Sequence, residues 1–219
     1  LLRDDISKRQ FIDLINFRYS YNIQFLNSFS HLEDKQYFEE FIPINDEEVF
    51  LDVGSYDGYT SEEFLKFNPN YKEIHIFEPD PVNMTKVKKR LKNYQNISFH
   101  EVGLSNKRGS LGFECSGSES KILDIGLSKV EVDRLDNILN INATFIKIDI
   151  EGSEFDAIEG MTGTIQKYHP KIAISVYHKV GDFWRIPGLI LDIRPDYDIY
   201  LRHYTESIYE TVMFFIPKK

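Results

Sequence analysis

The chain has a single cysteine, Cys115, among its 219 residues, so an internal disulfide is excluded. Disulfides are typical of oxidising compartments, and their absence favours a reducing one, so we predict a cytoplasmic protein. No apolar run approaches the length that crosses a bilayer, and no signal peptide is visible, so we predict no membrane span. The chain begins with Leu1 rather than Met, which leaves open whether it is a piece of a longer protein.

The chain also has fewer basic residues than acidic ones, 26 Lys and Arg against 35 Asp and Glu. The formal net charge is −9 and the isoelectric point is about 5.2, whereas nucleic-acid-binding domains usually carry a basic surface. We therefore predict no nucleic-acid partner. A basic run at residues 86–92 fits the solvated face of a helix, and we assign it no function. With 42% hydrophobic residues, the chain can build one large core.

Two common nucleotide-binding motifs are also absent. A dinucleotide fingerprint needs Gly-x-Gly-x-x-Gly, a P-loop ends in Gly-Lys-Ser/Thr, and neither occurs. Residues 49–60 instead read Val-Phe-Leu-Asp-Val-Gly-Ser-Tyr-Asp-Gly-Tyr-Thr, and their bulky first five residues predict a buried parallel strand. Gly54 and Gly58 predict a tight turn whose backbone approaches a ligand. Thr60 with Glu63 matches a capping box that opens a helix.

The acidity of this turn indicates which ligand it binds. Asp52 and Asp57 would repel a pyrophosphate, whereas they suit S-adenosylmethionine (SAM), which carries a sulfonium and an ammonium. The next predicted strand, residues 73–77, ends at Glu78, near the place where a Rossmann-type sheet puts the carboxylate that holds a ribose diol. The alternative is a capped turn plus a surface acid. We predict a SAM site formed by Asp52, Gly54, Tyr56, Asp57, Gly58, Glu78, Pro79, Gly103 and Asp149.

Further strands and helices alternate along the chain. Residues 1–45 predict a helical lead-in with one apolar face, and residues 46–219 predict the SAM-binding domain. The apolar face of the lead-in comprises Ile12, Ile15, Tyr19 and Ile23.

Asp80 with Pro81 predicts a helix start. Later strands are expected at residues 97–102, 111–114, 130–132, 144–148, 171–176 and 197–201, with an antiparallel partner at 209–216; the polar stretch 116–120 is predicted to be a mobile loop or lid.

Polar residues gather where these strands end. In open α/β sheets, ligands bind beyond the carboxyl ends of the strands. The predicted strand ends carry Gly54, Asp57, Glu78, Asp149, Glu151, His178, Arg202 and His203. The chain's polar chemistry therefore falls on one rim of the predicted sheet.

The same stretches resemble the FkbM family of SAM-dependent methyltransferases, from about residue 37 to 215. The stretches that carry the resemblance are Phe-Leu-Asp-Val-Gly-Ser-Tyr-Asp-Gly-Tyr-Thr at 50–60, Phe-Glu-Pro-Asp at 77–80, Phe-Ile-Lys-Ile-Asp-Ile-Glu-Gly-Ser-Glu at 145–154, Ile-Ser-Val-Tyr-His at 174–178 with Asp182, and Tyr-Leu-Arg-His-Tyr at 200–204. The resemblance implies a Rossmann-like class I methyltransferase fold: a seven-stranded, mostly parallel sheet with an antiparallel last strand. It also implies O-methylation of a hydroxyl on a sugar, glycan or small natural product.

A hydroxyl acceptor needs a base, and His178 is the predicted one, because an imidazole titrates near neutrality. The alternative is a core histidine bonded to the backbone. Asp149 and Glu151 could orient the acceptor, or bind a divalent metal together with His178 and Asp182; Asp149 would also border the methionine part of SAM. For Asp182 the alternative is a helix N-cap.

Arg202 and His203 are predicted to bind the acceptor, a small molecule or glycan; the alternative is that they pair with surface acids. The sequence indicates neither the acceptor's identity nor the oligomeric state. A second functional hypothesis is a non-catalytic cofactor-binding module within a longer multidomain protein. The polar rim favours an enzyme, since a pure binder needs no His178. A nicotinamide-dependent enzyme is a third possibility.

Overall fold

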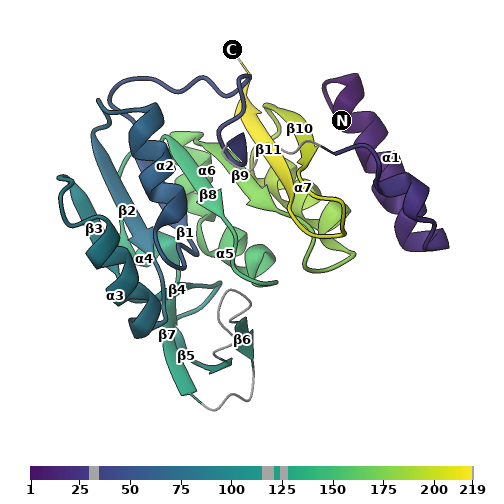
Figure 1. The fold of residues 1–219 in the computed structure, drawn as a ribbon. Coiled ribbons are helices and arrows are strands. Elements are labelled where there is room, and N and C mark those ends of the chain that lie inside the picture. The colour runs from purple at the N-terminus through teal and green to yellow at the C-terminus, as the bar shows by residue number, and fades with distance from the viewer. Residues whose placement is uncertain (30–34, 115–120, 124–127, 219) are drawn as a thin grey trace.

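A seven-stranded sheet forms the centre of the computed structural model, which describes residues 1–29, 35–114, 121–123 and 128–218 (Figure 1). The strand order is β10-β11-β9-β8-β1-β2-β3. Only β11 runs antiparallel to its neighbours, so the predicted fold is confirmed. The strands are β1 (Val49–Val53), β2 (Glu73–Phe77), β3 (Ile97–His100), β8 (Phe145–Ile148), β9 (Lys171–Ser175), β10 (Tyr197–His203) and β11 (Thr211–Pro217).

Helices cover both faces of this sheet (Figure 1). The helices are α1 (Asp5–Ser20), the 3₁₀ turn η1 (Ile23–Leu26), α2 (Tyr59–Phe67), α3 (Pro81–Arg90), α4 (Leu135–Ile138), α5 (Glu154–Gly160), α6 (Thr162–Tyr168) and α7 (Asp182–Ile193). The central strand β1 is buried throughout: Leu51 packs into the core on the side of α5 to α7, and Phe50 into the core beneath α2 and α3. Burial on two faces explains why β1 is apolar except for Asp52.

A smaller second sheet extends from the carboxyl end of the main one (Figure 1). It has the order β4-β7-β5-β6, formed by β4 (Gly103–Leu104), β7 (Ser128–Asp133), β5 (Gly109–Glu114) and β6 (Lys121–Leu123). The predicted short strands 111–114 and 130–132 lie within β5 and β7. The predicted loop 116–120 and Cys115 lie outside the described residues.

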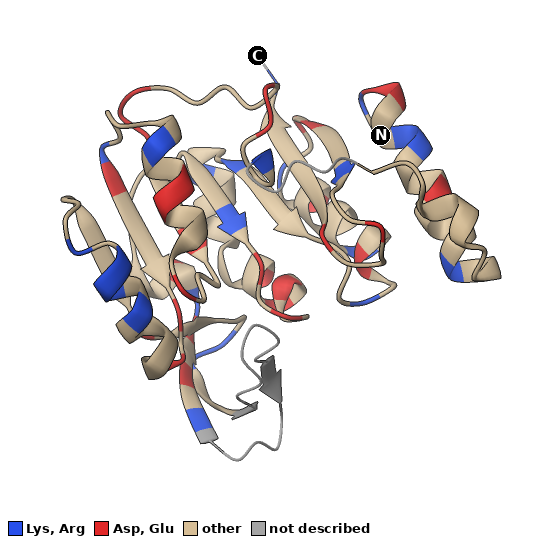
Figure 2. Cartoon of the chain, in the orientation of Figure 1, with Lys and Arg blue, Asp and Glu red and all other residues tan. Residues whose placement is uncertain are grey.

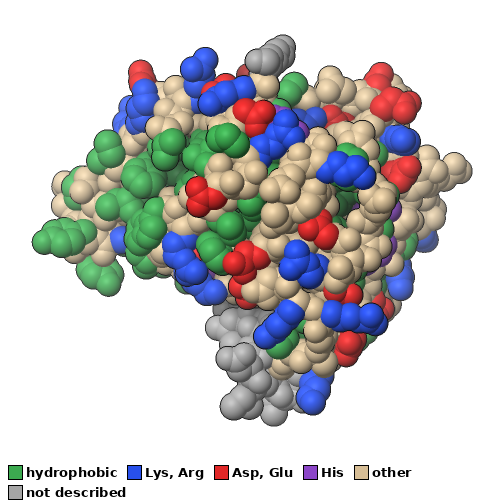
Figure 3. Space-filling view, turned by 180° about the vertical axis from the view of Figure 1, so that it is seen from behind, with side chains coloured by type: hydrophobic (Ala, Val, Ile, Leu, Met, Phe, Trp, Pro, Cys, Tyr) green, Lys and Arg blue, Asp and Glu red, His purple; other side chains and the backbone are tan. Residues whose placement is uncertain are grey.

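The predicted apolar face of the lead-in is wrong, although α1 itself is confirmed. Ile12, Tyr19 and Ile23 are 56%, 91% and 74% exposed, and Figure 3 shows apolar side chains gathered on this side of the molecule. The inward face of α1 is instead mixed: Ser7 and Gln10 are buried beside Leu14, and Phe11 packs against the core together with Ile15, the fourth predicted member. Ser7 is buried because α1 packs against the edge strand β10, where the Ser7 hydroxyl accepts the backbone N–H of Leu201 at 2.9 Å.

The two predicted helix starts, at Thr60 and at Asp80, have different outcomes. The capping box at Thr60 and Glu63 is wrong: α2 follows Gly58, whose φ of +85° is left-handed, and Glu63 pairs with Lys66. The helix start at Asp80 is confirmed, because its carboxylate accepts backbone N–H groups at the start of α3. In Figure 2 the basic residues of α3 stand on an outer helix face. Within the described residues, no helix is both long and apolar enough to cross a membrane.

Candidate cofactor and active site

A pocket of about 270 Å³ opens at the carboxyl ends of β1, β2 and β8. The predicted site residues that line it are Gly54, Tyr56, Asp57, Glu78, Pro79, Gly103, Asp149 and Glu151. The predicted site residues that do not line it are Asp52, Gly58, His178, Asp182, Arg202 and His203. His178 nevertheless lies directly behind two lining carboxylates, so the sequence prediction of a single polar rim holds for most of its members.

Gly54 is required by the protein's own packing. Its φ is +80°, and a Cβ atom placed there would lie 1.8 Å from the backbone carbonyl oxygen of Asp149. The sequence predicts this glycine because a ligand approaches the turn. The structure requires it because the carbonyl group of Asp149 occupies the space of a Cβ atom. Gly58 likewise packs against α3, with its missing Cβ 3.3 Å from the Cα atom of Val87. These contacts fix the turn after β1 against its neighbours.

Asp52 is a buried structural carboxylate, which corrects its predicted cofactor contact. It lies 3.1 Å from the ammonium of Lys147 and accepts hydrogen bonds from the hydroxyls of Ser55 and Ser61. Lys147 also donates to the backbone carbonyl of Gly54 at 2.5 Å. The group ties β1, β8 and the glycine turn together under the pocket floor.

The charge of Asp57 is also compensated. Its carboxylate lies 2.6 Å from the guanidinium of Arg90 and accepts the backbone N–H of Tyr59 at 3.0 Å. Because Asp52 and Asp57 each have a cationic partner, the predicted repulsion of a pyrophosphate by this turn does not follow from these two residues alone.

Glu78 closes the β2 side of the pocket. One carboxylate oxygen accepts the N–H of Tyr56 at 2.8 Å and the other accepts the N–H of Asp80 at 2.9 Å. Burial raises the pKa of this carboxyl despite the two backbone donors. A carboxylate has about four acceptor positions, so Glu78 retains lone pairs that can accept hydrogen bonds from a ligand diol in the pocket.

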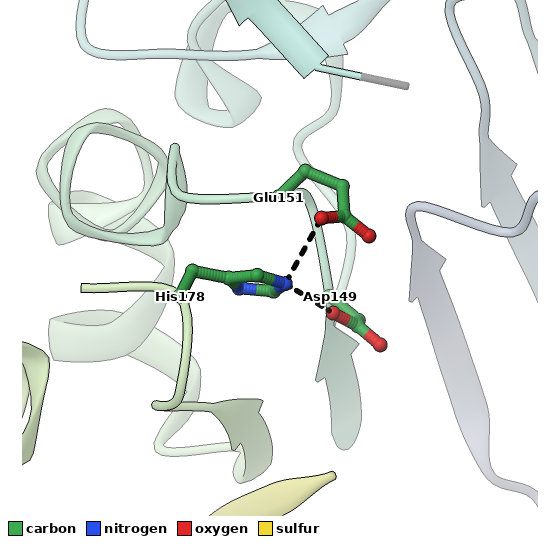
Figure 4. Close-up of side chains that lie close together, drawn as sticks. All are labelled: Asp149, Glu151 and His178. Carbon is green, nitrogen blue, oxygen red and sulfur yellow. Dashed lines mark ion pairs between the residues drawn. The ribbon is translucent and has the colours of Figure 1, made fainter. Parts of the chain in front are cut away.

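The β8 side of the pocket carries three acids around one histidine. Figure 4 shows two of them, Asp149 and Glu151, beside His178. His178 Nε2 lies 3.7 Å from Asp149 Oδ1 and 3.3 Å from Glu151 Oε2, while Nδ1 lies 2.9 Å from Glu154 Oε1. The contacts are ion pairs, because neither ring nitrogen forms a well-directed hydrogen bond. Glu151 has a left-handed φ of +55°, and Gly152 follows at +96°, which turns the loop back towards the histidine.

The predicted near-neutral titration of His178 is wrong for this arrangement. Burial lowers its pKa, but the carboxylates of Glu151 and Glu154 outweigh burial and raise the pKa to about 10. The ring therefore holds a proton at neutral pH and cannot accept another. Burial raises the pKa of Asp149, with Lys147 and His178 acting in the opposite direction.

Asp182 does not join this cluster. It is the first residue of α7, it is almost fully buried, and its Oδ2 accepts the backbone N–H of Lys179 at 3.1 Å. The metal-competent group among the described residues contains Asp149, Glu151 and His178 without it. Asp182 thus closes the turn before the helix, close to the capping alternative, although Gly181 occupies the N-cap position.

Arg202 and His203 are not placed to bind an acceptor, which corrects that prediction. Strand β10 continues to His203, so both residues belong to the sheet rather than to a loop beyond it. Arg202 pairs with Asp4 at 2.7 Å, and His203 is 1% exposed with Nδ1 2.9 Å from the hydroxyl of Thr211. The alternative prediction for these residues, pairing with an acid, is the one that Arg202 follows.

Four residues around the pocket were missed by the sequence reasoning. Lys147, Tyr177 and Glu210 line it, and the buried Tyr37 donates its hydroxyl to Asp149 Oδ2 at 2.8 Å. Lys147 and Tyr177 stand inside or beside recognised motifs and could have been chosen. Tyr37 and Glu210 come from turns far away in the sequence, where no local pattern signals a site.

Comparisons with known proteins agree with this geometry. The model of the methyltransferase FkbM domain matches residues 52–206. The crystal structure of methyltransferase FkbM from Methylobacillus flagellatus is similar at 26% identity and a TM-score of 0.86, over 98% of this chain and 56% of that one. This chain thus spans little more than half the length of that relative. No curated protein sequence matches significantly.

More distant structures share the fold. An Aeropyrum pernix fibrillarin with natively bound S-adenosyl-L-methionine is similar at 11% identity and a TM-score of 0.54, over 82% of this chain and 71% of that one. A precorrin-6y C5,15-methyltransferase from Geobacter metallireducens is similar at 14% identity and a TM-score of 0.51, over 81% and 84%. Identities this low show the fold alone. Because the family model covers most of the chain, the protein belongs to the FkbM methyltransferase family.

Proposed function

We propose that this protein transfers a methyl group from SAM to a hydroxyl of a small molecule, sugar or glycan. The observation that carries the proposal is one pocket with two different halves: the glycine turn and Glu78 on the β1–β2 side, and Asp149 and Glu151 on the β8 side. The family membership supports the chemistry. The alternative, a non-catalytic binding module in a longer protein, would use the β8 half only to hold the cofactor.

SAM, when bound, supplies an electrophilic methyl group, so the chain's own task is to bind, align and exclude water. Glu78 is placed to accept hydrogen bonds from the ribose diol, and Tyr56 and Pro79 line the same side of the pocket. Asp149 and Glu151 would attract the ammonium or orient the acceptor hydroxyl. Tyr37 and Lys147 hold Asp149 in place, the first by a hydrogen bond and the second by charge.

The charge around the pocket favours a neutral acceptor over an anionic one. Its lining includes several acids but a single lysine, and that lysine is engaged by a buried carboxylate. The lining acids are Asp57, which Arg90 compensates, and Glu78, Asp149, Glu151 and Glu210. A phosphorylated or carboxylated acceptor would meet repulsion here, and so would a nucleic acid. The cytoplasmic location stays a prediction that rests on the single cysteine.

A methyl-transfer screen tests the proposal. The protein is incubated with SAM labelled in its methyl group and with neutral polyhydroxylated acceptors, beside phosphorylated acceptors and RNA as comparison sets. We expect label in a neutral hydroxyl compound and none in the anionic sets. Transfer only to RNA, or to amines but not hydroxyls, would contradict the acceptor class while leaving the family assignment intact.

A further inference from the structure

The buried imidazole of His178 points an unused nitrogen at two carboxylates. Its side chain is 9% exposed, and Nε2 makes no hydrogen bond although Asp149 and Glu151 stand on either side of it (Figure 4). Oδ1 of Asp149 is likewise buried without a hydrogen-bond partner. Buried polar atoms are nearly always satisfied, so unsatisfied ones facing a common point indicate a missing partner.

The spacing of these atoms suits a small cation. One ligand atom from each of Asp149, Glu151 and His178 lies within 4.8 Å of the others. Bonds of ~2.1 Å to one ion at right angles would place neighbouring ligand atoms ~3.0 Å apart. The two measured separations from Nε2, 3.3 and 3.7 Å, need only a small contraction to reach that value.

Glu154 supplies the support that a metal-binding histidine needs. Histidine ligands usually donate their second ring N–H to a carboxylate, which fixes the ring and leaves the other nitrogen free for the metal. Glu154 Oε1 lies 2.9 Å from Nδ1 of His178 and is fully buried. The same oxygen accepts the backbone N–H groups of Ile150 at 2.9 Å and Gly152 at 3.3 Å. One carboxylate therefore aligns the imidazole and the loop that carries the two acidic ligands.

Charge balance agrees with the geometry. Three carboxylates surround one imidazole, so even with the ring protonated these four side chains together carry two net negative charges. A divalent cation bound to a neutral imidazole reduces this excess to one. Carboxylates suit Mg²⁺, Ca²⁺ and Mn²⁺, whereas imidazole suits transition metals. Mn²⁺, Fe²⁺ and Zn²⁺ are transition ions that accept both kinds of ligand, and Mn²⁺ is the one among them that prefers oxygen most.

We propose that Asp149, Glu151 and His178 bind one divalent metal ion of the Mn²⁺ class, with Glu154 positioning His178. Asp149 and Glu151 line the pocket, so the open positions of the ion face the space where the acceptor would bind. A hydroxyl coordinated there loses its proton more readily than a free one. That role rests on the proposed function, whereas the binding of the ion does not.

Electron paramagnetic resonance tests the site with Mn²⁺ alone, in the absence of SAM. The signal of free Mn²⁺ disappears as the ion binds, so a titration gives stoichiometry and affinity. We expect one Mn²⁺ per chain, and at least tenfold weaker binding in Glu151→Gln and His178→Ala. Glu154→Gln should weaken binding about 10- to 100-fold, the usual effect of losing such a supporting carboxylate.

The control is a second histidine–carboxylate pair on the same chain. His169 and Asp196 form an ion pair at 3.3 Å outside the pocket, without a third metal ligand. Asp196→Asn should bind Mn²⁺ like the unaltered protein. Equal affinity in Glu151→Gln and the unaltered protein, or no loss of free signal at millimolar Mn²⁺, would overturn the proposal.

Folding and cofactor binding are checked separately. Thermal melting of each variant shows whether it folds. Glu151→Gln keeps the shape of a partly exposed side chain, so we expect this variant to fold. Its Mn²⁺ affinity therefore tests the site even if His178→Ala is unstable. S-adenosylhomocysteine binding without Mn²⁺ binding would refute the metal site alone. Mn²⁺ binding without S-adenosylhomocysteine binding would refute the proposed function alone.

Discussion

Glu78 has no ion-pair partner among the described residues; it accepts two backbone N–H groups and still faces the pocket. If it holds a ribose diol, Glu78→Ala should weaken the binding of S-adenosylhomocysteine by ~1–3 kcal/mol, the worth of hydrogen bonds to a charged group. That is about 5- to 150-fold in Kd. Isothermal calorimetry measures the change.

The matched control for Glu78 is Glu101, an exposed acid after the neighbouring strand β3 that faces Lys88 at 3.9 Å. Glu101→Ala should leave the affinity unchanged. If both variants bind S-adenosylhomocysteine as the unaltered protein does, Glu78 is a turn-forming residue only.

Gly54 allows a prediction about stability at the same scale. In Gly54→Ala the new methyl group would overlap the carbonyl oxygen of Asp149, 1.8 Å away, and the φ of +80° is unfavourable for alanine. Left-handed backbone alone costs roughly 1–2 kcal/mol, so we expect a loss of at least about 2 kcal/mol in the free energy of unfolding. Urea denaturation measures it.

Gly188 provides the opposite case. It lies inside α7, and a Cβ atom there would meet nothing within 4 Å. Gly188→Ala should therefore stabilise the protein by roughly 0.5–1 kcal/mol, because glycine loses more backbone entropy than alanine in a helix. A similar loss in both variants would show that the packing described at Gly54 is not what constrains it.

At the scale of elements, Asp4, the N-cap of α1, is joined to β10 by an ion pair with Arg202 at 2.7 Å. Burial raises the pKa of Asp4, but hydrogen bonds from Arg202 and Ser7 outweigh it and lower the pKa to about 2. An unfolded aspartate titrates near ~3.9. The contribution of the Asp4 carboxylate to stability is therefore complete above the unfolded pKa of ~3.9. It is lost as the pH falls towards the folded pKa of about 2.

Asp4→Asn should lower the free energy of unfolding at pH 7 by ~1–2 kcal/mol, since a charged hydrogen bond to a largely buried Arg202 is lost at a partly exposed site. The difference from the unaltered protein should shrink as the pH falls towards 2. Asp5→Asn is the control, because its pairing with Lys8 is exposed. A deficit in Asp4→Asn that does not change with pH would contradict the role of the ion pair.

The sequence predicted correctly those elements whose residue pattern indicates burial on two faces. The bounds of β1 and β2 are as predicted, and Asp80 caps α3. Periodicity misplaced most of the apolar face of α1, because Ser7 and Gln10 are buried beside the strand edge while Ile12 and Tyr19 face solvent. The pattern predicts that the strand ends at residue 201 with Arg202 and His203 beyond it, because it does not show that β10 continues through them.

At the scale of the whole molecule, the site is assembled from segments far apart in the sequence. The motifs predicted which strand ends meet, since parallel strands share one rim. They could not predict that Tyr37 and Glu210 reach the same pocket, nor that three acids hold a proton on His178. Those facts depend on tertiary contacts.

The central claim is that this pocket binds SAM. Calorimetric titration of the unaltered protein with S-adenosylhomocysteine, which lacks the transferable methyl group, tests it without any knowledge of the acceptor. NAD serves as the competing ligand. We predict saturable, one-site binding of S-adenosylhomocysteine on the micromolar scale and no heat from NAD. Clear binding of NAD with no heat from either SAM or S-adenosylhomocysteine would contradict the account.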